Sequence, residues 1–358
     1  MNLSIGIVGL PNVGKSTLFN ALLKRQAAFM ANYPFATIEP NVGVVPVPDD
    51  RLKRLAEVEK EELKMDKLPP EVPATVKFVD IAGLVAGAAV GQGLGNKFLS
   101  HIREVDVICH VVRYFSDANV VHVAGNVEPK RDREIVNSEL ILADLDTLEK
   151  SKIKSQKSKL QVKSQKEAVE KLISEMNKGV LAKDISLTDE EKESIKDFQL
   201  LTMKPVIYVA NVSEDELKKE INIDGEKVFP ISAKIESELS SLSDAEQKAY
   251  FKELGLEAPG LDRLIQLAYK TLGLISFLTA GEKEVRAWTI TKGTLAPQAA
   301  GVIHTDFKKG FIKADVVSFA DFVALGGWQK AREVGKVRME GREYMMRDGD
   351  VVEFKVNA

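Results

Sequence analysis

The stretch GLPNVGKST at residues 9–17 decides the fold of this chain. It fits the pattern G-x-x-x-x-G-K-[ST] of a phosphate-binding loop. Residues 3–8 before it form a short apolar run, which predicts a buried strand, and residues 18–23 after it begin a helical pattern. A strand, a glycine turn and a helix N-terminus together direct backbone N–H groups at one point, where an anion binds. We therefore expect Lys15 to contact the β- and γ-phosphates of a nucleotide and the Ser16 hydroxyl to bind Mg²⁺.

The amino-acid composition predicts a globular protein of the reducing cytosol. The 358 residues are 44% hydrophobic, which is enough for two or three domains with cores of their own. The formal net charge of −3 gives no overall attraction to nucleic acid or membranes. Cys109 is the only cysteine, so no disulfide can form within the chain. The first apolar run leads straight into the phosphate-loop motif and no run reaches a membrane-spanning length, so we expect a soluble, cytoplasmic protein without a leader or a membrane segment.

Two later segments have the composition of nucleotide-sensing switches. Residues 32–41 are rich in proline and polar residues and contain Thr37, whose hydroxyl is placed to reach Mg²⁺; a plain surface turn is the alternative. Asp80–Gly83, after a strand pattern, fits D-x-x-G, which places a carboxylate near Mg²⁺ and a glycine amide near the γ-phosphate. The glycine-rich residues 87–95 that follow predict a mobile second switch, or else an unstructured connector.

The residue after D-x-x-G departs from Ras-type enzymes, in which a glutamine at this position orients the attacking water. Here the position is Leu84, whose side chain has no polar group. We therefore expect slow intrinsic hydrolysis, or another group that supplies the function. His122, which follows an apolar strand pattern at residues 107–112, is one candidate, and a purely structural histidine is the alternative.

Residues from about 129 to 202 differ in character from the rest, because they are highly charged and poor in glycine. Apolar residues recur at helical spacing from Leu140 to Met176, which predicts an antiparallel pair of helices projecting from the core. Lysines recur from Lys150 to Lys166 without an intervening acid. Such a stripe could bind phosphate-rich RNA, or it could be a solvated helix face.

The chain then returns to a strand pattern at residues 204–211, which ends where a GTPase carries N-K-x-D; here Glu214 replaces the aspartate and the lysine is missing. That aspartate accepts hydrogen bonds from the N1–H and 2-amino groups of guanine, and adenine offers neither group. The substitutions therefore predict a weakened or lost preference for guanine. A strand pattern at residues 227–231 and the loop Ser232–Lys234 complete a series of five elements, so we expect an α/β fold with a mainly parallel sheet and helices on both faces.

The last part of the chain, from about residue 274, has short alternating strand patterns at residues 285–290, 311–316 and 351–356. We expect a small α+β domain there. Basic residues recur from Lys308 to Arg342, which is compatible with contact to RNA or protein; a solvated face is the alternative.

Taken together, these motifs resemble the YchF family, the Obg-like ATPases of the TRAFAC class of P-loop NTPases. The matching residues are Gly9–Thr17, Phe35–Asn41, Asp80–Phe98, Asn211–Glu214, His304–Phe307 and Gly310–Ile312. The resemblance implies a nucleotide-binding domain at residues 1–128 and 203–273, interrupted by a helical coiled-coil arm at residues 129–202. It further implies a C-terminal TGS domain of β-grasp form at residues 274–358, binding of ATP in preference to GTP or alongside it, and association with ribosomes.

The motifs and the resemblance assign a role to each candidate residue. The nucleotide-binding residues are Asn12, Val13, Gly14, Lys15, Ser16, Thr17, Asn211, Val212, Glu214, Ser232 and Ala233, and the Mg²⁺ ligands are Ser16, Thr37 and Asp80. The resemblance implies that the backbone near Val212 contacts adenine and that His122 takes part in hydrolysis with Lys15. It also implies that Asn12 holds K⁺, as in potassium-activated relatives.

Three hypotheses about function follow. The first is a Mg²⁺-dependent ATPase that hydrolyses ATP slowly as a conformational switch, with the ribosome as its partner and RNA contacts through the lysine-rich arm and the C-terminal domain. The second, which Leu84 motivates, is a nucleotide-gated binding module with negligible turnover. The third is a conventional GTPase, against which Glu214 argues.

Overall fold

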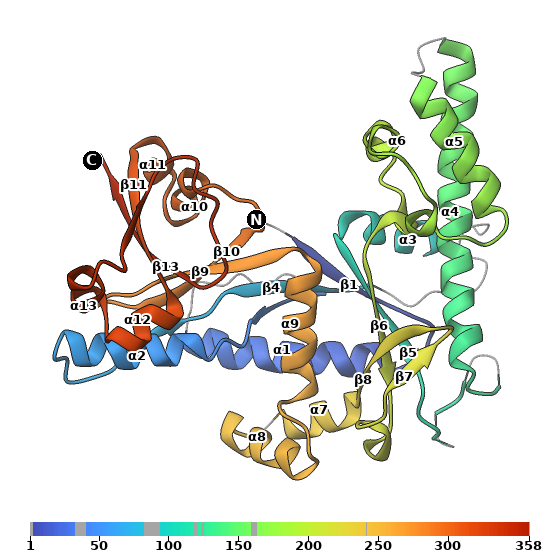
Figure 1. Cartoon of the computed structure of the whole chain (residues 1–358). Helices are drawn as coiled ribbons and strands as arrows, with labels where there is room; N and C mark the ends of the chain where they lie inside the picture. The colour runs from blue at the N-terminus through green and yellow to red at the C-terminus, as the bar shows by residue number, and fades with distance from the viewer. Residues whose placement is uncertain are drawn as a thin grey trace. The chain divides into compact units, whose positions relative to one another are not determined.

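The computed structural model describes residues 3–32, 41–81, 94–117, 120–122, 125–158, 163–240 and 242–357. The chain divides into two compact units (Figure 1). Leu3–Val44 and Lys77–Leu264 form the larger unit, and Val45–Val76 and Ile265–Ala358 form the smaller unit. The smaller unit thus takes a segment from early in the chain, which the three-part division expected from the sequence does not include; the limits of that division remain a prediction.

A seven-stranded sheet carries the phosphate-loop motif. Side by side, its strands are β2 (Val42–Pro46), β4 (Thr75–Asp80), β1 (Ser4–Val8), β5 (Val107–Arg113), β6 (Val206–Asn211), β8 (Glu226–Ile231) and β7 (Ile221–Ile223). From β4 to β8 the neighbouring strands run parallel, whereas β7 is antiparallel to β8. Strands β1 and β5 are buried along their whole length, which explains their nearly continuous apolar sequences. The expected mainly parallel sheet is confirmed.

Helices α1 (Lys15–Asn32) and α3 (Leu94–Glu104) connect strands of this sheet. Three more helices follow β8, its last strand in the chain: α7 (Ala233–Leu239), α8 (Asp244–Glu253) and α9 (Gly260–Thr271). Helix α1 begins directly after the glycine turn and packs against α7. Helix α8 begins with a capping box, in which Ser243 and Glu246 satisfy each other's backbone N–H groups.

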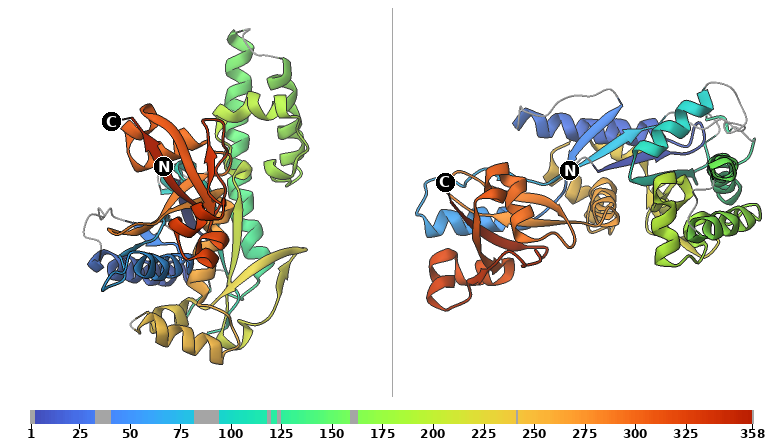
Figure 2. Two further views of the ribbon diagram at one scale, coloured as in Figure 1. Left: turned by 60° about the vertical axis from the view of Figure 1, so that its left-hand side comes forward. Right: turned by 90° about the horizontal axis from the view of Figure 1, so that it is seen from above.

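The inserted segment forms a pair of helices, α4 (Pro129–Ser158) and α5 (Lys163–Met176), which lie side by side in both views of Figure 2. Helix α6 (Asp189–Ile195) and three short 3-10 turns return the chain to β6. Leu148, Val169 and Leu172 are among the buried residues that join the helices. Asp144 of α4 is fully buried and accepts hydrogen bonds at 2.8 Å from the backbone N–H groups of Leu201 and Thr202. The helical pair expected from the spacing is confirmed.

The smaller unit is built on a six-stranded mixed sheet. Side by side, its strands are β12 (Arg338–Glu340), β11 (Phe311–Ser318), β13 (Asp350–Val356), β9 (Leu274–Thr279), β10 (Val285–Thr291) and β3 (Glu71–Val72). Its helices are α2 (Arg51–Glu62), α10 (Ala296–Ile303), α11 (Thr305–Lys309), α12 (Phe319–Leu325) and α13 (Trp328–Glu333). Phe277, Phe311 and Val352 belong to its core. The three strands expected here are confirmed, and β3, β9 and β12 are additions.

Cys109 lies in the middle of β5, between β1 and β6. It is fully buried, and burial raises the pKa of its thiol to about 12. Across the described ranges, no helix is both long enough and apolar enough to span a bilayer.

Candidate functional site

The phosphate-loop motif adopts a backbone that only glycine permits at two positions. Gly9 has φ +152° and Gly14 has φ +96°. A Cβ atom at Gly9 would lie 2.3 Å from the carbonyl oxygen of Val111, and one at Gly14 would lie 2.1 Å from Nδ2 of Asn211. The first contact would require movement of the β5 backbone and the second would displace the Asn211 side chain, so the two glycines allow the loop to approach β5 and Asn211 closely.

Lys15, the first residue of α1, carries a buried ammonium group. Its side chain is buried, and Nζ donates a hydrogen bond of 2.6 Å to the carbonyl oxygen of Leu10 within the same loop. Burial lowers the pKa of Lys15 to about 8, and the Asp80 carboxylate opposes this shift. Burial likewise raises the pKa of Asp80, and Lys15 opposes that shift. The ammonium and the carboxylate are therefore close enough to interact electrostatically. Ser16 and Thr17, which follow Lys15 in α1, are exposed.

Asn211, at the end of β6, joins the two loops at which the nucleotide is expected. Its Nδ2 donates to the carbonyl oxygen of Val13 at 2.9 Å, and its Oδ1 accepts from the backbone N–H of Ala233 at 3.0 Å. The adjacent Val212 donates its backbone N–H to the carbonyl oxygen of Ile231 at 2.8 Å. The phosphate loop, the end of β6 and the start of α7 thus form one hydrogen-bonded assembly.

Glu214 is exposed and follows this assembly in a short 3-10 turn. Its Oε1 accepts a hydrogen bond of 3.2 Å from the hydroxyl of Tyr250 on α8. Ser232, next to Ala233, is buried. Val212, Ser232 and Ala233 therefore adjoin Asn211, whereas Glu214 contacts Tyr250, an aromatic residue that the sequence patterns did not indicate.

His122 lies on a segment that is connected both to the phosphate loop and to the arm. Asn12 donates its Nδ2 to the carbonyl oxygen of Val121 at 3.1 Å. The imidazole of His122 is buried, and its Nε2 lies 2.7 Å from Oδ2 of Asp132 in the first turn of α4. Oδ1 of Asp132 lies 3.3 Å from the guanidinium of Arg131. Asn12 and His122, expected from the sequence, are thus brought to one segment, and Asp132 is a further residue of this site.

Arg113, at the end of β5, holds the start of the same segment. Its guanidinium is buried and donates to the carbonyl oxygens of Phe115, Asp117 and Val120 at 3.0–3.2 Å. No motif points to Arg113 or Asp132. The one signal for Asp132 in the sequence is its place in the first turn of a helix that begins with proline, where an acid is favoured.

Of the three expected Mg²⁺ ligands, Ser16 and Asp80 lie among the described residues. Thr37 lies outside the described residues, as do Gly83 and Leu84. Among the described residues, no group of three or more His, Cys, Asp or Glu side chains is arranged to hold a metal ion. The expected site is of another kind, because it takes its oxygens from two hydroxyls, one carboxylate and the phosphates of the nucleotide. The Ser16 hydroxyl and the half-buried Asp80 carboxylate fit such a site.

Comparison with protein families gives two matches. A family model described as "50S ribosome-binding GTPase" matches residues 4–141. A second, labelled as the C-terminal part of YchF GTPases and described as "Protein of unknown function (DUF933)", matches residues 274–357. The first match covers the start of the larger unit together with Val45–Val76 of the smaller one, and the second covers most of the rest of the smaller unit.

Full-length relatives give closer matches. The chain is 49% identical to a Bacillus subtilis protein named "Ribosome-binding ATPase YchF" and 48% identical to an Escherichia coli protein of the same name, over 100% of each chain. Among solved structures, "Structure of the Schizosaccharomyces pombe YchF GTPase" matches with a TM-score of 0.85 and 38% identity, over 99% of this chain and 98% of that one. The names agree on the family and differ on the nucleotide.

Proposed function

The chain belongs to the YchF family, and on that premise we propose that it is a magnesium-dependent ATPase that hydrolyses ATP slowly and uses it as a conformational switch on the ribosome. One observation carries the proposal: the buried Lys15 ammonium at the head of α1, in a glycine loop beside Asp80. A buried cation at a helix N-terminus, where the first backbone N–H groups of the helix have no partners within the helix, favours a polyanion.

The phosphates bind between Lys15 and the backbone N–H groups of residues 12–17. Ser16, Thr37 and Asp80 hold Mg²⁺, which neutralises charge on the phosphates when it is bound. Asn12 is the residue of this chain that could hold K⁺ through its side-chain oxygen, because its Nδ2 is engaged by Val121.

The base lies against the assembly around Asn211. The backbone at Val212 and the loop at Ser232 and Ala233 contact the base, while Asn211 keeps these loops at a fixed distance from the phosphate loop. Glu214 replaces the aspartate that reads guanine, and Tyr250 holds its carboxylate. Both features favour adenine over guanine or leave the site tolerant of both.

His122 supplies the function of the missing glutamine, and Asp132 is its positioning residue. A carboxylate bonded to one ring nitrogen fixes the orientation and tautomer of an imidazole. The bond at 2.7 Å therefore helps to orient the imidazole of His122. Because Asp132 belongs to α4, a movement of the arm would reach His122 through this contact.

The partner is the ribosome, as the names of the bacterial relatives support, with RNA contacts through the lysines of the arm and the basic residues of the smaller unit. We expect a protein with this role in the cytoplasm. A conventional GTPase is the second candidate, because the Schizosaccharomyces pombe relative of known structure is named a GTPase.

The proposal is tested by titrating ATP and GTP into the protein side by side with Mg²⁺ present, and by measuring turnover of each. We expect tighter binding of ATP and slow release of phosphate that requires Lys15. Tight binding of GTP with no binding of ATP would leave only the GTPase. Binding without turnover would support the nucleotide-gated module.

A further inference from the structure

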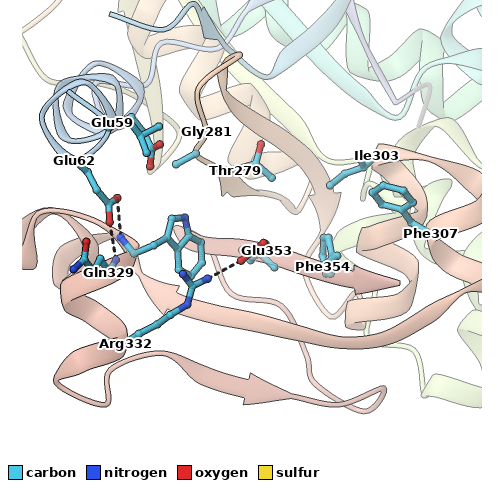
Figure 3. Close-up of a pocket in the computed structure, with 14 residues that line it drawn as sticks. Glu59, Glu62, Thr279, Gly281, Ile303, Phe307, Gln329, Arg332, Glu353 and Phe354 are labelled. Atoms are coloured by element: carbon cyan, nitrogen blue, oxygen red, sulfur yellow. Dashed lines mark hydrogen bonds and ion pairs between the residues drawn. The ribbon is translucent and has the colours of Figure 1, made fainter. Parts of the chain in front are cut away.

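The smaller unit contains a pocket of about 640 Å³ that the nucleotide site does not explain. It is lined by residues of α2, β9, β13, α11, α13 and the end of α10, all within that unit. Figure 3 shows Glu59 and Glu62 on one side of the pocket and Ile303 and Phe307 on the opposite side. The pocket therefore has an acidic end and an apolar end.

Glu59 provides a buried acceptor that is not satisfied. The residue is 2% exposed, and its Oε1 is buried without a hydrogen-bond partner among the described residues. Burial raises the pKa of Glu59 to about 7, and the neighbouring Glu62 raises it further. An unmet buried acceptor is costly, so a ligand that donates a hydrogen bond there is stabilised.

The other charged groups of the pocket already have partners. Glu62 accepts the backbone N–H groups of Trp328 and Gln329 at 3.0 and 2.6 Å (Figure 3). Glu353 lies 2.7 Å from the guanidinium of Arg332, the one cation among the lining residues. Once these pairs are made, Glu59 is the carboxyl group that remains, so the unpaired charge of the pocket is negative.

The rest of the lining indicates what kind of cation fits. Phe307 and Phe354 line the pocket, and aromatic faces attract organic cations. Trp328 also lines it, but its ring already has the Arg332 guanidinium over it, 5.2 Å from the ring centroid. The described carboxylates do not converge in the way that a metal ion requires. A phosphate or other anion would meet the unpaired carboxyl group. An ammonium group on an apolar stem matches both ends of the pocket.

We propose that this pocket binds an alkylammonium group, with the ammonium on Glu59 and the stem against Ile303 and Phe307. The group is carried either by a small aliphatic amine or by a lysine side chain. The proposal is independent of nucleotide binding, because every residue that it uses belongs to the smaller unit.

The test is calorimetric titration of the full chain, without nucleotide, with pentylamine and with pentan-1-ol, which has the same stem and no charge. We expect pentylamine to bind at least about tenfold more tightly. Its affinity should rise between pH 6 and 8, because the amine stays charged while Glu59 loses its proton. Equal affinities, or no binding of pentylamine, would overturn the proposal.

Three variants locate the site. Glu59→Gln should weaken the binding of pentylamine at least about tenfold, whereas Glu61→Gln, an exposed position on the same helix outside the pocket, should leave it unchanged. Ile303→Trp, which fills the apolar end and keeps the charge, should also block binding. Unchanged affinity in a folded Glu59→Gln or Ile303→Trp protein would refute the assignment.

Lysine blocked at both backbone ends distinguishes the source of the alkylammonium group: if it binds more tightly than pentylamine, the natural ligand is a lysine side chain.

Discussion

The phosphate loop of the larger unit and the pocket of the smaller unit each contain a buried ionisable group, of opposite sign. Burial lowers the pKa of Lys15 to about 8 and raises the pKa of Glu59 to about 7. Lys15 nevertheless has an acceptor in Leu10 and an acid in Asp80, whereas Oε1 of Glu59 has no partner among the described residues. The difference shows that burial alone does not define a site. The hydrogen-bond and charge partners of the buried group decide whether it is already satisfied in the free protein, as Lys15 is, or needs a ligand, as Glu59 does.

The largest effect is expected on the side of the phosphate loop. Lys15→Met removes the buried cation, so ATP binding or turnover should fall on the order of 10²–10³-fold. Lys24→Met, at an exposed position of the same helix, should change neither. Calorimetry and phosphate release measure both quantities. Turnover at the wild-type rate in Lys15→Met would show that the phosphate loop is not the site of ATP hydrolysis.

On the side of the pocket, the charge of Glu59 should destabilise the fold at high pH. Its pKa in the folded state lies above the unfolded value of 4.5, so the stability that protonation provides is fully present below pH 4.5 and is lost as the pH rises to about 7. Glu59→Gln should therefore raise the free energy of unfolding by up to about 3 kcal/mol at pH 8, and hardly at all at pH 4. Urea unfolding at the two pH values checks this, and an equal effect at both would contradict it.

Lys15 should show the mirror image of this behaviour. Its folded pKa lies below the unfolded value of 10.5, so the stability associated with the neutral amine is present above pH 10.5 and is lost as the pH falls to about 8. At pH 7 the buried charge costs about 3 kcal/mol, and the hydrogen bond to Leu10 returns about 1 kcal/mol. Lys15→Met should thus stabilise the nucleotide-free protein by about 2 kcal/mol in urea unfolding. If Lys15→Met instead destabilises the protein, the contacts of the Lys15 ammonium in the loop outweigh the cost of burying its charge.

The next effect tests whether the contacts around the phosphate loop act on chemistry. Asp132→Asn keeps the shape of the partner of His122 and removes its charge, so turnover of ATP should fall about thirtyfold while the dissociation constant stays the same. Glu134→Gln, an exposed position of the same helix, is the control. A change in binding without a change in turnover would give Asp132 a structural role only.

The smallest effect concerns the choice of base. Glu214→Asp shortens the acid to the length found in GTPases and removes its bond to Tyr250. The ratio of GTP to ATP affinity should rise about tenfold, as competition titrations would show. An unchanged ratio would mean that Glu214 does not contact the base.

Local patterns in the sequence predicted most of the larger unit. The glycine loop, the apolar runs that became β1, β4, β5 and β6, and the helical spacing of the arm each have a period or motif of their own. The pairing of β3 with β10 has no such local signal in the sequence, because it joins two residues near position 71 to a strand more than two hundred residues later. Long-range contacts of this kind depend on register and packing, which a single sequence does not display.

The same reasoning explains which site residues escaped prediction. Asp132 contacts His122 across 10 positions of the chain and Tyr250 contacts Glu214 across 36, and neither Asp132 nor Tyr250 lies in a motif. Glu59 looks like any acid on a charged helix until the surrounding unit buries it. The roles assigned to all the predicted site residues, in nucleotide binding, Mg²⁺ binding and catalysis alike, remain predictions.

Cys109 offers a way to watch the central sheet without altering the protein. Alkylating reagents attack the thiolate, and a fully buried thiol with a pKa of about 12 is almost never in that form. Modification therefore requires β5 to separate from its neighbours, and no second cysteine competes for the reagent. The labelling rate in native buffer reports how often this opening occurs. If ATP slows the labelling of Cys109, the ratio of the two rates gives the free energy by which the bound nucleotide stabilises the closed sheet against this opening.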